Sequence, residues 1–139
     1  MEITYDHVAL RVTDLDRSIQ FYREIFDLEP RGRRTLGDNK TEQVVYRVGE
    51  EVFVLFRRDE FRPVDLKTPM GMDHLAFTLD GKSYGEVLTR LKERGMILRG
   101  PEQNSGSRGQ GLATYFRDPD GIEIEIKTYD PDLMARYPA

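Results

Sequence analysis

The sequence predicts an α+β fold made of two similar halves, and three observations support this prediction. Residues 6–12 and 73–79 both begin with an Asp-His pair and continue with alternating apolar side chains, 67 positions apart (74 − 7). These two stretches hold the only two histidines among the 139 residues. Each is followed by helical spacing and then by strand-like runs, so the order strand, helix, strand, strand, strand is expected twice.

The first half, residues 1–60, is expected to begin with a strand over residues 5–12, because apolar side chains alternate there. This alternation places His7 on the face opposite the apolar stripe. Asp14 is a suitable N-cap for a helix with apolar residues at helical spacing, which is expected to end near Pro30. The other strands of this half are expected over residues 28–34, 43–48 and 51–56.

The second half, residues 71–129, repeats this order after a polar linker at residues 61–70. A strand at residues 73–79 is expected to lead to a helix at residues 83–94, with Gly95 as its C-cap. Further strands are expected over residues 97–100, 112–117 and 122–127. Two segments are expected to be irregular, a flexible loop at residues 101–111 and a C-terminal tail at residues 130–139.

The composition limits the classes of function. Residues 1–139 are expected to form a single domain, which is long enough to bury a core. The chain has no cysteine, which excludes thiolate metal sites and fits a cytoplasmic location. It shows no membrane-spanning apolar run and no secretion pattern, so no membrane association is expected. A net charge of −4 argues against binding to nucleic acid.

Imidazole and carboxylate side chains that can hold a metal ion occur in three stretches. His7 and His74 occupy equivalent positions in the two halves, and the strand expected over residues 122–127 carries two glutamates. Because Glu123 and Glu125 both alternate with isoleucines, the pattern itself does not choose between them. The alternative interpretation is that these are ordinary strand histidines and solvent-facing acids. Aligning the last strands of the two halves places Leu55 opposite Glu125.

Four motifs occur in order along residues 5–129, namely Asp6-His7, residues 14–22, residues 73–77 and residues 115–121. Together they resemble the vicinal oxygen chelate superfamily, which includes glyoxalases, extradiol dioxygenases, fosfomycin-inactivating enzymes and bleomycin-sequestering proteins. The resemblance implies paired βαβββ modules that form a curved mixed sheet around a metal-binding cleft.

The same resemblance implies that His7, His74 and Glu125 are metal ligands and that Tyr115 is a catalytic residue near the metal. A glyoxalase would place a fourth ligand at Leu55, so the three-ligand dioxygenase and fosfomycin branches are nearer. Two imidazoles and one carboxylate favour Fe(II) or Mn(II), and they also accommodate Zn, Ni or Co.

The expected function is a metal-dependent enzyme that chelates a small-molecule substrate through vicinal oxygens, with dioxygenase-like chemistry, in a homodimer. One alternative is a fosfomycin-type transferase or hydrolase that opens an epoxide, and another is a metal-free protein that sequesters a ligand. The extradiol pattern in this resemblance also needs a histidine about eight to ten residues before the tyrosine, and in that region this chain has Gly106, Ser107 and Arg108.

Several polar residues have two interpretations. Tyr115 is either the catalytic tyrosine of the resemblance or an aromatic core residue. Glu123 is either a base or an exposed polar group. Four arginines could hold an anionic substrate group or could be solvated surface charges, and these are Arg31, Arg33, Arg34 and Arg108.

Overall fold

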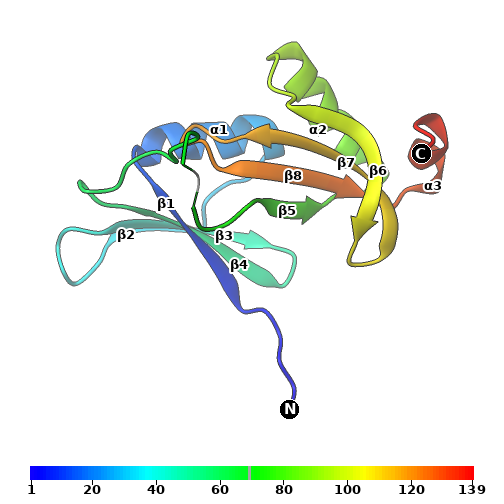
Figure 1. The fold of residues 1–139 in the computed structure, drawn as a ribbon. Coiled ribbons are helices and arrows are strands. Elements are labelled where there is room, and N and C mark those ends of the chain that lie inside the picture. Colours follow the sequence, from blue (N-terminus) through cyan, green and yellow to red (C-terminus); the bar gives the residue numbers. More distant parts are fainter. Residues whose placement is uncertain (69) are drawn as a thin grey trace. The chain divides into compact units, whose positions relative to one another are not determined.

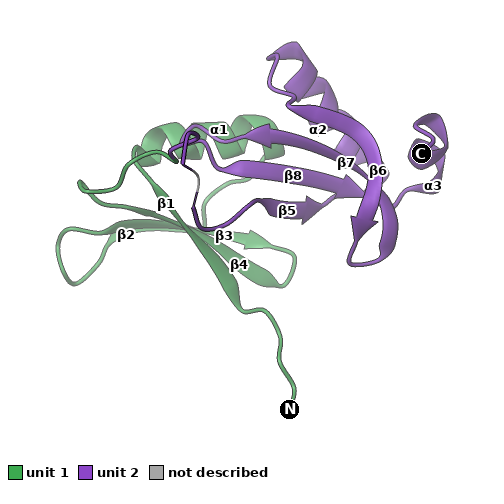
Figure 2. Ribbon diagram, viewed as in Figure 1, with its two compact units in different colours: residues 1–64 green, residues 65–139 purple. Residues whose placement is uncertain are grey.

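A computed structural model describes residues 1–68 and 70–139. The chain divides into two compact units, Met1–Val64 and Asp65–Ala139, which are coloured separately in Figure 2. Pro69, part of the predicted linker at residues 61–70, lies outside the described residues. Each unit has its own four-stranded sheet.

The first unit has the element order strand, helix, strand, strand, strand (Figure 1). Its elements are β1 (His7–Val12), α1 (Leu15–Phe26), β2 (Gly32–Thr35), β3 (Glu42–Val48) and β4 (Glu51–Arg57). The strand order in the sheet is β1-β4-β3-β2, with β1 parallel to β4 and the other pairs antiparallel. The strand that the sequence predicts at residues 28–34 corresponds to β2, which begins later than expected, at Gly32.

Helix α1 begins where the sequence predicts, because the Asp14 carboxylate accepts a hydrogen bond from the Arg17 backbone N–H at 3.0 Å. It ends at Asp27, which adopts a left-handed conformation with φ of 55°. The fully buried Tyr22 ring lies 5.1 Å from the Phe53 ring of β4. Phe53 and its alternate neighbours therefore face the helix, and Val52, Val54 and Phe56 face the other side of the sheet.

The second unit repeats this order and adds one short helix (Figure 1). Its elements are β5 (Leu75–Thr78), α2 (Gly81–Glu93), β6 (Arg99–Gly106), β7 (Gly109–Arg117), β8 (Glu123–Thr128) and α3 (Pro131–Arg136). The strand order is β5-β8-β7-β6, with β5 parallel to β8. The predicted α+β architecture of paired βαβββ modules is confirmed.

Two segments that the sequence predicts to be irregular are ordered, so those two predictions are wrong. Most of the predicted loop at residues 101–111 belongs to a hairpin in which β6 pairs with β7 from Glu102↔Ala113 to Gly106↔Gly109. The predicted tail contains α3, because the Asp130 carboxylate caps the backbone N–H groups of Asp132 and Leu133 at 3.0 Å. Turn-forming residues thus serve here as strand and cap residues.

The observed register also corrects the alignment of the two halves. In the first unit Ala9 pairs with Val54, and in the second unit the equivalent Ala76 pairs with Glu125. The neighbouring strands agree, since Val45 pairs with Val54 and Tyr115 pairs with Glu125. Val54, and not Leu55, is therefore the counterpart of Glu125. Leu55 is fully buried on the face that α1 covers.

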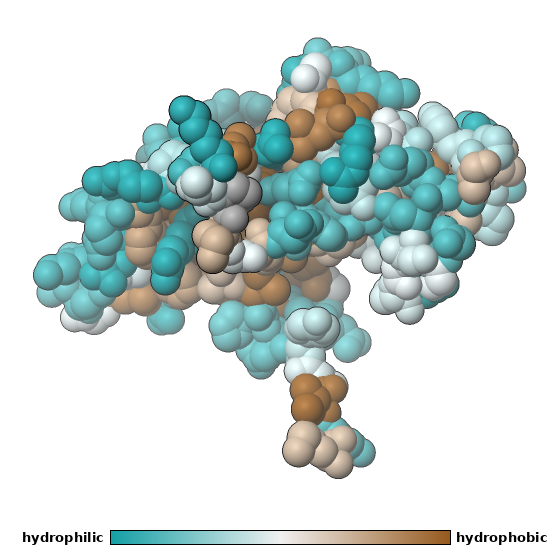
Figure 3. Space-filling view, in the orientation of Figure 1, coloured by the Kyte–Doolittle hydropathy of each residue, from teal (hydrophilic) through white to brown (hydrophobic). Residues whose placement is uncertain are grey.

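None of the helices in the described residues combines the length and apolar character needed to cross a membrane. The segment before β1 exposes three apolar side chains, Met1, Ile3 and Tyr5. Apolar colour at this end of the chain is visible in Figure 3.

Candidate metal centre

His74 and Glu125 come together at one face of the second sheet. His74 immediately precedes β5, and Glu125 lies on the adjacent parallel strand β8, opposite Ala76. The distance from His74 Nε2 to Glu125 Oε2 is 3.0 Å. The other ring nitrogen, Nδ1, lies 2.6 Å from the Asp73 carboxylate, a contact of the kind that fixes the tautomer and orientation of metal-binding imidazoles.

The alternation of β8 explains why Glu125 faces this site. Ile124 and Ile126 are fully buried, and they project to the opposite face from Glu125 and Lys127. An amphipathic strand would leave these two charged side chains in water, but they are only 7% and 5% exposed. The alternative interpretation of Glu125 as a solvent-facing acid is therefore wrong.

Two residues that sequence reasoning did not single out complete the surroundings of Glu125. Lys127 Nζ lies 3.4 Å from Glu125 Oε1 and donates to the Asn104 backbone carbonyl at 3.1 Å. It also contacts the side-chain oxygen of Asn104. The spacing of Lys127 from Glu125 was a usable signal, but Asn104 lay in a segment predicted to be a loop.

Tyr115 lies beside the histidine and is held in place by its own contacts. Its ring centroid is 5.9 Å from that of His74, with the planes at 84°. The Asn104 amide donates to its hydroxyl at 2.6 Å, and the Arg99 guanidinium lies 3.6 Å from its ring centroid. Burial, followed by the negative charge of Glu125, raises the pKa of Tyr115, so the phenol keeps its proton at neutral pH.

Glu123 is the second carboxylate near His74. One of its oxygens lies 3.3 Å from Arg99 Nη1. Donor atoms of Asp73, His74 and Glu123 also lie within 4.8 Å of one another, so this trio is a second possible donor set. The structure thus brings His74 close to both glutamates between which the alternation does not choose.

His7 begins β1 in the first unit, and Val52 is its register partner on β4. Its Nδ1 contacts the Asp6 carboxylate, which repeats the Asp73–His74 arrangement. The side chain is 51% exposed. The place of His7 in a ligand set with His74 and Glu125 stays a prediction.

Arg31, Arg33 and Arg34 lie on or next to β2, whose four residues are all exposed, whereas Arg108 lies in the β6–β7 turn. Arg33 forms ion pairs with Asp16 and, at 3.4 Å, with Glu42. These contacts favour the interpretation of Arg33 as a surface charge.

The donors of this site fit a divalent cation on chemical grounds. An oriented imidazole nitrogen and a nearly buried carboxylate oxygen approach to 3.0 Å, and both are ligand types that Fe, Mn, Zn, Co and Ni accept. Asp73 supplies the hydrogen-bond partner that such imidazoles usually have. His74 and Glu125 could therefore hold two of the coordination positions of a metal ion.

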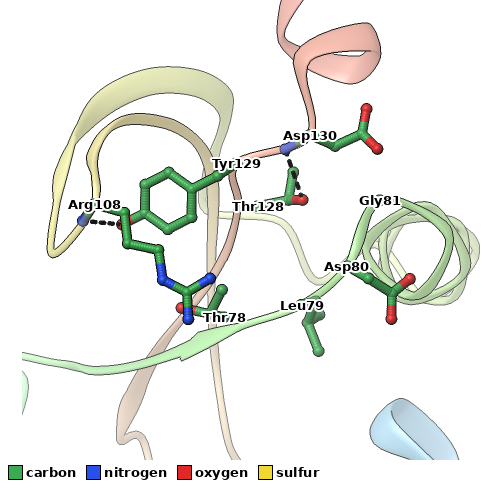
Figure 4. A pocket seen from close by; sticks show the side chains of 8 residues that line it. All are labelled: Thr78, Leu79, Asp80, Gly81, Arg108, Thr128, Tyr129 and Asp130. Carbon is green, nitrogen blue, oxygen red and sulfur yellow. Dashed lines mark hydrogen bonds between the residues drawn. The ribbon is translucent and has the colours of Figure 1, made fainter.

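A separate hollow of about 440 Å³ lies in the second unit (Figure 4). Its lining comes from the end of β5, the start of α2, the β6–β7 turn, and the end of β8 with the segment that follows it. Tyr129 borders it, and its hydroxyl accepts a hydrogen bond from the Arg108 backbone N–H at 3.2 Å. None of the predicted metal ligands lines this hollow.

Comparisons with known proteins agree with this architecture. The family model described as Glyoxalase/Bleomycin resistance protein/Dioxygenase superfamily matches residues 4–126. The Metallothiol transferase FosB of Staphylococcus epidermidis is 30% identical over 132 residues, covering 92% of this chain and 84% of that protein. The Glutathione transferase FosA of Serratia marcescens is 28% identical over 134 residues, covering 96% and 85%. Among solved structures, a glyoxylase/bleomycin resistance protein/dioxygenase domain from Frankia sp. EAN1pec matches with a TM-score of 0.73 and 27% identity, covering 94% and 95%.

Proposed function

This chain belongs to the Glyoxalase/Bleomycin resistance protein/Dioxygenase superfamily, and from that premise we propose that it is a metal-dependent enzyme. Its substrate is a small molecule that approaches the metal through two neighbouring oxygen atoms. The observation that carries the proposal is the 3.0 Å approach of His74 Nε2 to Glu125 Oε2 on a nearly buried strand face.

We propose His7, His74 and Glu125 as the ligands, with Fe(II) or Mn(II) favoured. The repeated Asp-His contact supports this assignment, since both imidazoles have the same carboxylate partner at Nδ1. A bound divalent cation supplies Lewis-acid polarisation of the substrate oxygens. Three protein ligands leave coordination positions for both oxygens of the substrate.

The other side chains of the site bind and orient the substrate. The Tyr115 hydroxyl keeps its proton and can donate a hydrogen bond to a substrate oxygen, while the Asn104 amide fixes the phenol. Arg99 lies over the Tyr115 ring and is itself held by ion pairs with Glu102 and Glu123, so it helps to fix the ring in place. Tyr115 is thus the proposed catalytic residue of this chain.

The reaction class that we favour is addition of a thiol or of water to an epoxide or a similar electrophile. The similarity to two transferases of the Fos type over more than 90% of the chain supports this choice. Both histidines of the sequence are assigned as ligands, so no third histidine remains as the acid–base partner of bound dioxygen.

Dioxygenase-like chemistry is the second candidate. It is favoured by Tyr115, whose ring lies beside that of His74 and which stands ten residues before Glu125. Proton transfer would then need a group other than a histidine. Glu123, which has a carboxylate oxygen within 4.8 Å of a His74 ring nitrogen, is the candidate base.

Metal content tests the proposal first. Protein purified without chelators is analysed for metal, together with His74→Ala and Glu125→Gln. We expect about one equivalent of divalent metal per chain in the natural protein and a strong loss in both variants. Protein that binds no divalent metal at any loading would support a ligand-sequestering protein instead.

Reaction assays then separate the two enzyme classes. We expect the Mn-loaded protein to add thiols or water to fosfomycin or related epoxides, with the ring-opened product detected by NMR. Oxygen uptake with a panel of catechols and no epoxide opening would favour the dioxygenase candidate.

A further inference from the structure

Lys127 is a buried charged residue for which the proposed function gives no role. It follows Glu125 by two positions on β8, so both side chains project from the same face of the strand. The Lys127 side chain is only 5% exposed. Lysine is rarely buried to this extent unless it is paired, and its partners therefore indicate what it does.

The two oxygens of Glu125 have different partners. Oε2 lies 3.0 Å from His74 Nε2, whereas Oε1 lies 3.4 Å from Lys127 Nζ. Lys127 Nζ is also held from the β6 side, where the Asn104 carbonyl accepts its hydrogen bond at 3.1 Å. The ammonium group is thus fixed against one oxygen and leaves the other oxygen to the histidine.

Strand β6, the second strand from β8 in the sheet, has room for the Lys127 side chain only because it carries a glycine at the contact. A Cβ at Gly106 would lie 2.4 Å from Lys127 Cε and 2.3 Å from the Tyr129 hydroxyl oxygen. Any larger residue there would push the end of the Lys127 side chain away from its present place. The position of the ammonium group is therefore set by β6 as well as by β8.

We propose that Lys127 is a positioning residue that occupies Oε1 of Glu125 and restricts this carboxylate to one donor oxygen, Oε2, toward a bound divalent cation. The inference rests on the proposed metal-binding function. Carboxylates bind cations through one oxygen or through both. If Oε1 of Glu125 also bound the cation, it would occupy a coordination position that a substrate with two neighbouring oxygens needs.

Cobalt titration of the metal-free full chain tests this inference without reference to activity. The visible absorption of Co²⁺ weakens as its coordination number rises, so it reports whether a second oxygen joins. In Lys127→Met we expect a weaker cobalt band than in the natural protein. We also expect a dissociation constant about ten- to a hundredfold lower, since a nearby positive charge at an effective dielectric constant of about 20 has been removed.

A second variant, Gly106→Ala, tests the same inference if Lys127→Met does not fold. Gly106→Ala keeps the charge but displaces the Lys127 ammonium, so the same weakening of the cobalt band is expected. Lys82→Met is the matched control for charge, because Lys82 is 87% exposed on α2. Gly85→Ala is the matched control for the added methyl group, because its Cβ meets nothing within 4 Å. Both controls should give the natural spectrum and affinity.

The outcomes separate the two proposals. If the natural protein binds no cobalt, the proposed function fails and this inference fails with it. If the natural protein binds cobalt but the band is unchanged in both Lys127→Met and Gly106→Ala, the inference is overturned and the metal site stands. An unchanged band with affinity lowered about 10- to 100-fold would identify Lys127 as an ordinary outer-shell support, which also overturns it.

Discussion

Val54 in the first unit occupies the position that Glu125 occupies in the second. Each is the register partner of the alanine that follows a histidine by two residues, Ala9 in one unit and Ala76 in the other. Register partners on adjacent strands share a sheet face, so Val54 lies on the face of His7. The duplicated architecture therefore carries a carboxylate at only one of two equivalent places.

Replacing Val54 with glutamate tests this equivalence. Val54→Glu should add a fourth donor on the His7 face and lower the Mn²⁺ dissociation constant by about tenfold or more, as additional charged ligands do. Isothermal titration calorimetry measures the change. Leu55→Glu is the control. Leu55 is fully buried on the sheet face that α1 covers, and a buried carboxylate there should destabilise the fold. Tighter binding in Leu55→Glu would contradict the register.

Tyr115→Phe should separate catalysis from metal binding. Loss of the hydroxyl removes the proposed hydrogen bond to substrate and should lower kcat by about 10²-fold or more. The Mn²⁺ affinity should stay within a few-fold of the natural value, because the phenol is not a proposed ligand. Steady-state kinetics with the substrate that the reaction assays identify measures the effect, and Tyr5→Phe, which alters an exposed tyrosine, is the control. An unchanged kcat would show that Tyr115 is an aromatic core residue and not a catalytic one.

Alkaline pH should destabilise the fold through two buried tyrosines. Burial raises the pKa of Tyr84 to about 12, against a partly opposing hydrogen bond with Thr114, and burial also raises the pKa of Tyr46 to about 12. In the unfolded chain tyrosine has a pKa of about 10. The folded state therefore holds these protons more tightly, and this contribution to stability is complete below pH of about 10 and is lost as the pH rises toward 12.

Tyr84→Phe checks this account in urea denaturation. The Tyr84 hydroxyl lies 2.6 Å from Thr114 Oγ1 in the core, so its loss should lower the free energy of unfolding by about 1 kcal/mol at neutral pH. The variant should also lose less stability than the natural protein between pH 10 and 12. Identical alkaline pH dependence in the two proteins would contradict the assignment.

Gly100→Ala should be far more costly than Gly109→Ala, although both glycines have positive φ, at 92° and 89°. A Cβ at Gly100 would lie 2.4 Å from the Ala113 carbonyl oxygen, whereas a Cβ at Gly109 meets nothing within 4 Å. Gly109→Ala should cost about 1–2 kcal/mol from backbone strain alone. Thermal unfolding measures both, and equal costs would show that close strand packing at Gly100 is unimportant.

The sequence predicted the parts of the fold that depend on local pattern. The repeated Asp-His motif at His7 and His74, with alternating apolar residues after each, was sufficient for the paired βαβββ order. The hairpin around Gly106 was missed because its residues favour turns, and only pairing with β7 makes them a strand.

The candidate site depends more on tertiary pairing. The alignment of the halves was wrong by one residue, because Val54 and Leu55 are both apolar and only the hydrogen-bonded register distinguishes them. The contact between Lys127 and Asn104 could not be predicted from sequence, since these residues are 23 positions apart in the chain and lie on different strands.

Anomalous diffraction from crystals of the full chain grown with Mn²⁺ tests the central claim most directly. We predict one strong manganese peak per chain, bound by Nε2 of His7, Nε2 of His74 and Oε2 of Glu125. A peak held instead by Asp73, His74 and Glu123, or no peak near His74, would contradict the proposed ligand set.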